Sequence, residues 1–202
     1  MAKRPKNNFK IRNFNSKVLI LCEGLTEKNY FNAFKEDLGL PKTIAVNIFQ
    51  SNKVDCKGVV EEAIKKAKRD GFEEIFVVFD HDNQAKRDEA FKLASDKNIK
   101  VVFSSICFEL WYLFHYKNST KAFASEAELE RELKKCAGME NYEKNNFKHY
   151  SILKDKITIA KSNTEKSRLT VVQNNEDIEI FNLNPFTNVD ELVVYLENQK
   201  DK

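Results

Sequence analysis

Two short apolar runs, residues 18–22 (VLILC) and residues 74–79 (EIFVVF), constrain the fold more than any other feature. Neither run alternates polar with apolar residues, which is typical of strands buried on both faces. Residues 43–49 and 99–103 are weaker candidates for further strands. Strands buried on both faces belong to parallel sheets that carry helices on each side.

Stretches with helical periodicity separate these runs, over residues 27–38, 58–69 and 84–96. Thr26 is placed to cap the first of them. Strands that alternate with helices of this length predict right-handed βαβ units. The expected fold class is therefore α/β, with a four-stranded, mainly parallel sheet flanked by helices.

After residue 103 the pattern changes to one that predicts a helical C-terminal part. Helices are expected over residues 108–116, 126–136, 150–160 and 189–199, and residues 171–183 suggest a short hairpin around Asn174-Asn175. The expected organisation is a basic flexible arm (residues 1–16), an α/β domain (17–116) and a helical extension packed on it (117–202).

Charge and cysteine content narrow the possible roles only a little. The 34 basic and 31 acidic side chains of the 202 residues leave +3, which does not by itself identify a nucleic-acid-binding protein. The arm is basic, however, and either serves solubility or contacts phosphates. Four scattered cysteines, with no apolar signal or membrane-spanning run, predict a cytoplasmic protein without a zinc or disulfide framework.

Acidic residues follow two of the expected strands directly. Glu23-Gly24 ends the first strand, and Asp80-His81-Asp82 ends the third. The carboxyl ends of parallel strands form the ligand-binding edge of such sheets, and chain alternation puts Asp80 and Asp82 on one side. Three converging carboxylates repel one another unless a cation lies between them, and oxygen ligands favour Mg²⁺ or Mn²⁺.

The motifs LILCEGLTE, VVFDHD, SSICFELWYLFH and NPFTNVDELV resemble, in this order, the RloB-like (AbiLii-type) proteins of bacterial phage defence. The resemblance extends from about residue 17 to residue 196. It implies a fold similar to the Toprim domain, in which Glu23, Asp80 and Asp82 would form the metal-binding acidic set. This chain has Ser104-Ser105-Ile106 where the family usually has Ser-Asn-Pro, which changes the turn before Glu109.

Several nearby residues allow two interpretations each. Glu109 is either a fourth acid of the site or the polar side of a core helix, and Glu27 is either an extra ligand or an acid favoured by the helix dipole. His115 is either a packed histidine or a general base. Lys117 and Lys121 either contact a phosphate backbone or are simply solvated.

The resemblance implies a Mg²⁺- or Mn²⁺-dependent nuclease acting on RNA, including tRNA, or on DNA, with an ATPase as partner protein and no membrane association. Glu23, Asp80, Asp82 and Glu109 would be its catalytic residues. The alternative is a non-catalytic binding or regulatory subunit of an ATPase-containing defence complex. A nucleotidyl-transferring enzyme is a weaker third possibility, because the chain lacks a Gly-rich phosphate loop.

Overall fold

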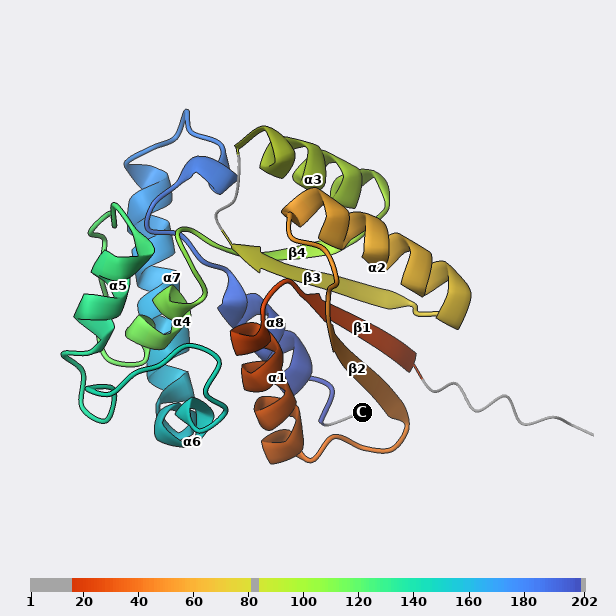
Figure 1. Ribbon diagram of the computed structural model, residues 1–202, viewed down its shortest axis with the longest axis horizontal. Helices are drawn as coiled ribbons and strands as arrows, with labels where there is room; N and C mark the ends of the chain where they lie inside the picture. The colour runs from red at the N-terminus through yellow and green to blue at the C-terminus, as the bar shows by residue number, and fades with distance from the viewer. Residues whose placement is uncertain (1–15, 81–83, 201–202) are drawn as a thin grey trace, which may run out of the picture.

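The computed structural model describes residues 16–80 and 84–200, and its centre is one four-stranded sheet (Figure 1). The strands are β1 (Ser16–Cys22), β2 (Ile44–Gln50), β3 (Glu74–Asp80) and β4 (Lys100–Ser104). Their order is β2-β1-β3-β4, and every neighbouring pair is parallel. The predicted α/β class with a four-stranded sheet is confirmed.

Helices cover both faces of this sheet. The helix α1 (Leu25–Leu38) lies on one face, and α2 (Cys56–Asp70) and α3 (Gln84–Asp96) lie on the other (Figure 1). Alternate residues of β1 divide accordingly: Ile20 belongs to the core under α1, whereas Leu21 belongs to the core under α2 and α3. Complete burial of both side chains explains the continuous apolar pattern of this strand.

The helix α1 leads from β1 to β2 over one face of the sheet, and the helix α3 leads from β3 to β4 over the other face. The carboxyl ends of the neighbouring strands β1 and β3 therefore form a topological switch point, where open α/β sheets bind their ligands. Cys22 is paired with Val78, so the residues that follow the two strands come out side by side.

The C-terminal part is helical, as predicted, and lies beside the sheet and beyond the carboxyl ends of its strands (Figure 1). Its elements are α4 (Glu109–Phe114), α5 (Glu126–Leu133), α6 (His149–Leu153), the 3-10 turn η1 (Lys154–Lys156), α7 (Ile157–Gln173), the 3-10 turn η2 (Ile180–Asn182) and α8 (Val189–Glu197). Buried Leu129, Leu153 and Leu192 belong to the same core cluster as Val18 and Ile20. The extension and the sheet thus share one core, and the domain boundaries stay a prediction.

Some local predictions are wrong. No hairpin forms around Asn174-Asn175, because α7 continues to Gln173 and burial of Val171 holds its last turn against the sheet. The helix expected over 150–160 is split into α6, η1 and the start of α7. Thr26 does not cap α1: Gly24 occupies the cap position, and the Thr26 hydroxyl bonds Asn145 instead.

Two further observations complete the description. No helix among residues 16–80 and 84–200 is long and apolar enough to cross a membrane. Residues 1–15 of the basic arm lie outside the described residues, as do His81 and Asp82.

Candidate acidic site

Glu23 and Asp80 meet at the carboxyl edge of the sheet. The Glu23 backbone N–H donates to the Val78 carbonyl oxygen at 2.8 Å, which continues the β1–β3 ladder by one residue. The Asp80 backbone N–H lies 3.5 Å from Oε2 of Glu23. The strand register therefore brings these two predicted site residues together, as the alternation of strands and helices indicated.

Half-buried Asp80 carries one carboxylate oxygen that the described residues leave unsatisfied. Its Oδ1 is buried and has no hydrogen-bond partner among them. Burial raises the pKa of Asp80 well above its ordinary value, and the negative charges of Glu27, Glu109 and Glu23 raise it further, whereas a hydrogen bond from the Phe108 backbone lowers it. A buried acid in this position needs a proton or a cation.

Glu27, in the first turn of α1, is a third acid of the same place. Its side chain is buried, and Gly24 makes room for it, since a Cβ on Gly24 would collide with the Glu27 carboxylate. Burial raises the pKa of Glu27 to about 7, Glu109 and Glu23 raise it too, and the positive charge of Lys144 lowers it. Its burial distinguishes it from an ordinary solvated acid at a helix start.

Glu109, the first residue of α4, is the fourth acid. Its side chain is buried, so it does not lie on a solvent-exposed face of that helix. The Tyr142 hydroxyl donates a hydrogen bond to Oε1 of Glu109. Burial and the neighbouring Glu109 charge raise the pKa of Tyr142, which keeps the hydroxyl protonated as a donor.

These four acids line one cavity of about 570 Å³. Gln50, Cys107, Phe108, Glu126, Lys144 and Asn145 are among the other lining residues. Lys144 is the only lining residue with a basic side chain in the described part of the chain, and it forms an ion pair with Glu126. The cavity wall thus carries several acidic side chains and, among the described residues, one basic side chain.

The wall that carries Lys144 is tied to α1. Asn145 accepts a hydrogen bond from the Thr26 hydroxyl at Oδ1 (3.1 Å) and another from Nδ2 of Asn29 at its carbonyl oxygen (3.0 Å). Asn145 and Ile106, which both line the cavity, have left-handed backbone conformations with φ values of 64° and 70°. Such conformations, costly for a β-branched residue like Ile106, are concentrated at functional sites.

The residue types that line the cavity suit a hard cation, but their side chains are not arranged around a common point in the described structure. All four acids offer oxygen ligands, and Oδ1 of Asp80 lacks a partner. Among the residues that the structure describes, however, no group of three or more His, Cys, Asp or Glu side chains is arranged to hold a metal ion. The third predicted ligand, Asp82, lies outside those residues, so its convergence with Glu23 stays a prediction.

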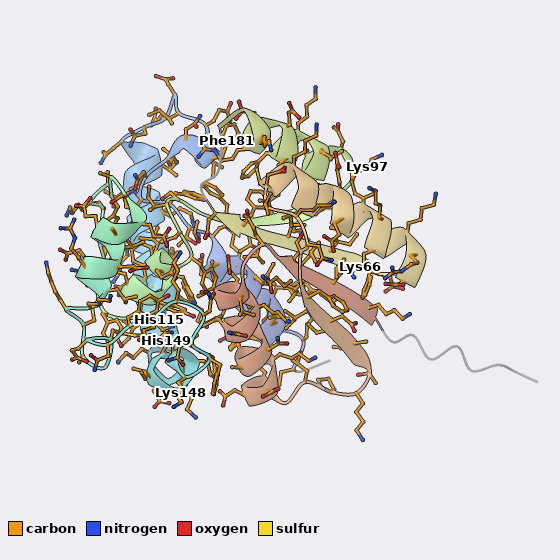
Figure 2. All side chains as sticks on the ribbon, viewed as in Figure 1. Lys66, Lys97, His115, Lys148, His149 and Phe181 are labelled. Carbon is orange, nitrogen blue, oxygen red and sulfur yellow. The ribbon has the colours of Figure 1, made fainter. Side chains whose placement is uncertain are left out.

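The two interpretations of His115 are separated by its surroundings. It does not line the acidic cavity but is buried at the C-terminal end of α4; His149, in α6, is buried as well (Figure 2). Its Nδ1 lies 2.9 Å from the Trp111 carbonyl oxygen, and its ring packs on Trp111 and Tyr30. Burial lowers the pKa of His115 to about 4, so at neutral pH it is a neutral packed histidine.

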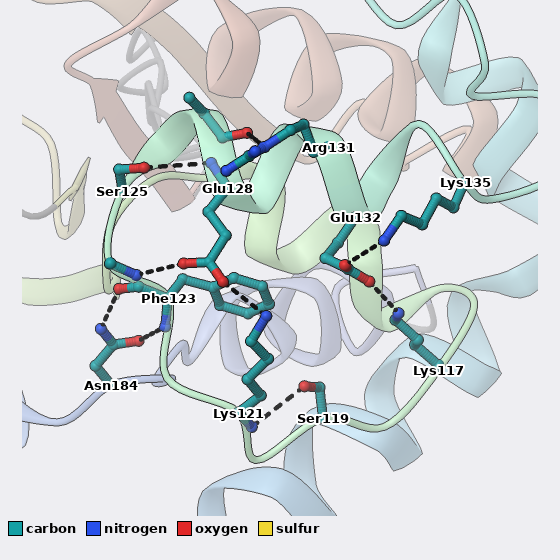
Figure 3. Close-up of polar contacts among 12 residues, drawn as sticks. Lys117, Ser119, Lys121, Phe123, Ser125, Glu128, Arg131, Glu132, Lys135 and Asn184 are labelled. Atoms are coloured by element: carbon teal, nitrogen blue, oxygen red, sulfur yellow. Dashed lines mark hydrogen bonds and ion pairs between the residues drawn. The ribbon is translucent and has the colours of Figure 1, made fainter.

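Lys117 and Lys121 are held by acidic side chains of α5 (Figure 3). Nζ of Lys117 lies 2.9 Å from Glu132, and Nζ of Lys121 lies 2.6 Å from Glu128. These lysines therefore connect the loop after α4 to α5. The sequence analysis did not identify Lys144 and Tyr142 as site residues, because residues 137–148 show neither helical nor strand periodicity.

Fold and site together define a doubly wound α/β protein with an acidic cavity at its topological switch point, the position where open α/β sheets bind their ligands. A family model described as RloB-like protein matches residues 18–196, and the chain belongs to this family. No curated protein and no solved structure shows significant similarity to the chain.

Proposed function

We propose that this protein is a metal-dependent nuclease of a bacterial anti-phage system that hydrolyses phosphodiester bonds of RNA or DNA. The observation that carries the proposal is the buried Oδ1 of Asp80, unpartnered among the described residues, in a cavity lined by four further acids. Such a concentration of negative charge destabilises the fold unless it serves a cation, and an oxygen-only set favours Mg²⁺ or Mn²⁺. The Toprim-like fold that the sequence resemblance implies would suit the same function.

Glu23 and Asp80 would hold the cation, with Asp82 as the further ligand that the resemblance implies. A cation bound there would polarise the phosphodiester and lower the pKa of an attacking water. Glu109 is held by Tyr142 in the wall of the same cavity, where it can accept a proton from that water or contribute to a second cation site. Glu27 adds negative charge from α1.

Lys144 is the residue placed to contact a substrate phosphate, because it reaches the cavity and is partly exposed. The basic arm, with Lys3, Arg4, Lys6, Lys10 and Arg12, would add sequence-independent contacts to the phosphate backbone. RNA, including tRNA, and DNA both satisfy these contacts. The substrate is therefore proposed as a nucleic acid without a choice between the two.

Digestion of tRNA and plasmid DNA with Mg²⁺ or Mn²⁺ tests the proposal. The natural chain should cut at least one substrate, and Asp80→Asn and Glu23→Gln should each abolish cleavage. Asp96→Asn, at the exposed end of α3, is the matched control and should leave cleavage unchanged. If Asp80→Asn cut as fast as the natural chain, the acidic cavity would not be the active site.

A second candidate function is that of a non-catalytic subunit that binds an ATPase partner protein. Exposed apolar side chains at the end of α7 and in the following segment favour it, since Leu169, Val172, Ile178 and Ile180 lie near one another in the chain. Calorimetric titration with Mn²⁺ separates the two, because a purely binding subunit need not bind the ion.

A further inference from the structure

Tyr142 connects the C-terminal extension to the acidic cavity through one buried contact. Its hydroxyl donates to Oε1 of Glu109, 33 residues earlier in the chain. The backbone N–H of Tyr142 donates to the Met139 carbonyl oxygen at 2.9 Å, and that of Met139 donates to Cys136 at 2.9 Å. Two consecutive turns after α5 therefore determine where this hydroxyl lies.

Aromatic packing fixes the Tyr142 ring as firmly as the backbone. The ring of His149, in α6, lies against it with centroids 4.5 Å apart and planes inclined by 30°. The Tyr112 ring meets it edge-on, with centroids 6.1 Å apart and planes inclined by 82°. Because Tyr142 is also only 3% exposed, its hydroxyl has little freedom to leave Glu109.

Glu109 needs such a donor because it stands among like charges. Its negative charge acts on both Asp80 and Glu27, so an unrestrained carboxylate would turn away from the cavity. A charge-assisted hydrogen bond from a tyrosine hydroxyl is strong and directional, and it opposes that movement. One oxygen of Glu109 is therefore fixed by the extension while the carboxylate stays in the cavity wall.

We propose that Tyr142 is a positioning residue that holds the Glu109 carboxylate in the acidic cavity, so that the C-terminal extension completes the active site. This inference rests on the proposed function. It assigns the extension a role in the chemistry, beyond packing on the sheet. Tyr142 acts through Glu109 and contacts no substrate.

The contact itself is tested without metal, by urea denaturation in EDTA of Tyr142→Phe, Glu109→Met and the double variant. Phe keeps the ring, and Met keeps the length of the side chain without its acceptor. We expect the two substitutions to be coupled by roughly tenfold or more in the unfolding equilibrium constant, as for hydrogen bonds to charged groups. Strictly additive effects would overturn the contact.

The positioning role is tested by calorimetric Mn²⁺ titration of the same variants. Tyr142→Phe should weaken Mn²⁺ binding about tenfold or more, and it should have little further effect in the Glu109→Met background. Tyr116→Phe is the matched control: it removes another hydroxyl contact between the region of α4 and the extension, the 3.0 Å bond to the Ala137 carbonyl oxygen, away from the acids. It should bind Mn²⁺ like the natural chain.

The outcomes separate this inference from the proposed function. If Tyr142→Phe bound Mn²⁺ as tightly as the natural chain while Glu109→Met bound it more weakly, the positioning role would be overturned. The nuclease proposal would still stand. If Tyr142→Phe weakened Mn²⁺ binding equally in the natural chain and in the Glu109→Met background, its effect would be structural. The positioning role would then be overturned as well. If the natural chain bound no Mn²⁺, both proposals would fail, and coupling in the EDTA measurement would still establish the contact.

Discussion

Replacing Glu27 with Gln should stabilise the metal-free protein, and the gain should grow with pH. The substitution keeps the shape of a buried side chain and removes its charge. Glu27 has a pKa of about 7 in the folded chain, against 4.5 for an ordinary glutamate. The folded state therefore holds the Glu27 proton more tightly than the unfolded state does. The stability that comes from holding this proton is complete below about pH 4.5, and it is lost as the pH rises through about 7.

The difference between these two pKa values corresponds to about 3.5 kcal/mol, since one pKa unit is worth about 1.4 kcal/mol. The stability difference between Glu27→Gln and the natural chain should thus increase by about 2.5 kcal/mol between about pH 5 and about pH 8. Urea denaturation in EDTA at these two pH values measures it. Taking the difference removes contributions from the buried histidines, which both proteins share.

Glu36→Gln, on the exposed side of the same helix, is the control and should show no such pH dependence. At saturating Mn²⁺ the natural chain should become more stable than Glu27→Gln, because the bound ion would neutralise the carboxylates whose negative charges repel Glu27. A stability difference that stayed constant between the two pH values would mean that burial and neighbouring like charges do not raise the pKa of Glu27.

Three other substitutions test separate parts of the structure. Arg168→Met should destabilise the fold by roughly 3 kcal/mol in urea denaturation, because it leaves buried Asp190 without its bidentate partner at 2.7 and 2.8 Å; an effect under about 1 kcal/mol would contradict this. Lys144→Met should raise the KM for nucleic acid several-fold with little change in melting temperature, and an unchanged KM would exclude the proposed phosphate contact. Gly24→Ala should lower Mn²⁺ affinity with little loss of stability, because its Cβ would displace only the carboxylate end of the Glu27 side chain; an unchanged Mn²⁺ affinity would disprove the close approach.

The meeting of Glu23 with Asp80 was predictable from the sequence. Strands buried on both faces require a parallel sheet, and parallel strands bring their carboxyl ends to one edge. That reasoning needs only local patterns, so it succeeds without knowledge of the packing. The same apolar patterns located all four strands to within one or two residues at each end.

The outer part of the site depends on tertiary contacts that leave no local signal. Tyr142 and Lys144 lie in an irregular segment far from the sheet in sequence, and only the packing of α5 and α6 brings them to the cavity. Glu109 is an intermediate case. A lone acid in the apolar sequence FELWYLF signals a special role, but its burial against Tyr142 could not be foreseen.

The central claim is that the acids at the ends of β1 and β3 bind a divalent cation. A crystal structure of the natural chain grown with Mn²⁺, examined by anomalous scattering, tests it most directly. We expect an anomalous peak in the acidic cavity within coordination distance of Oδ1 of Asp80 and a carboxylate oxygen of Glu23. A cavity without such a peak at saturating Mn²⁺ would show that these acids do not bind a divalent cation.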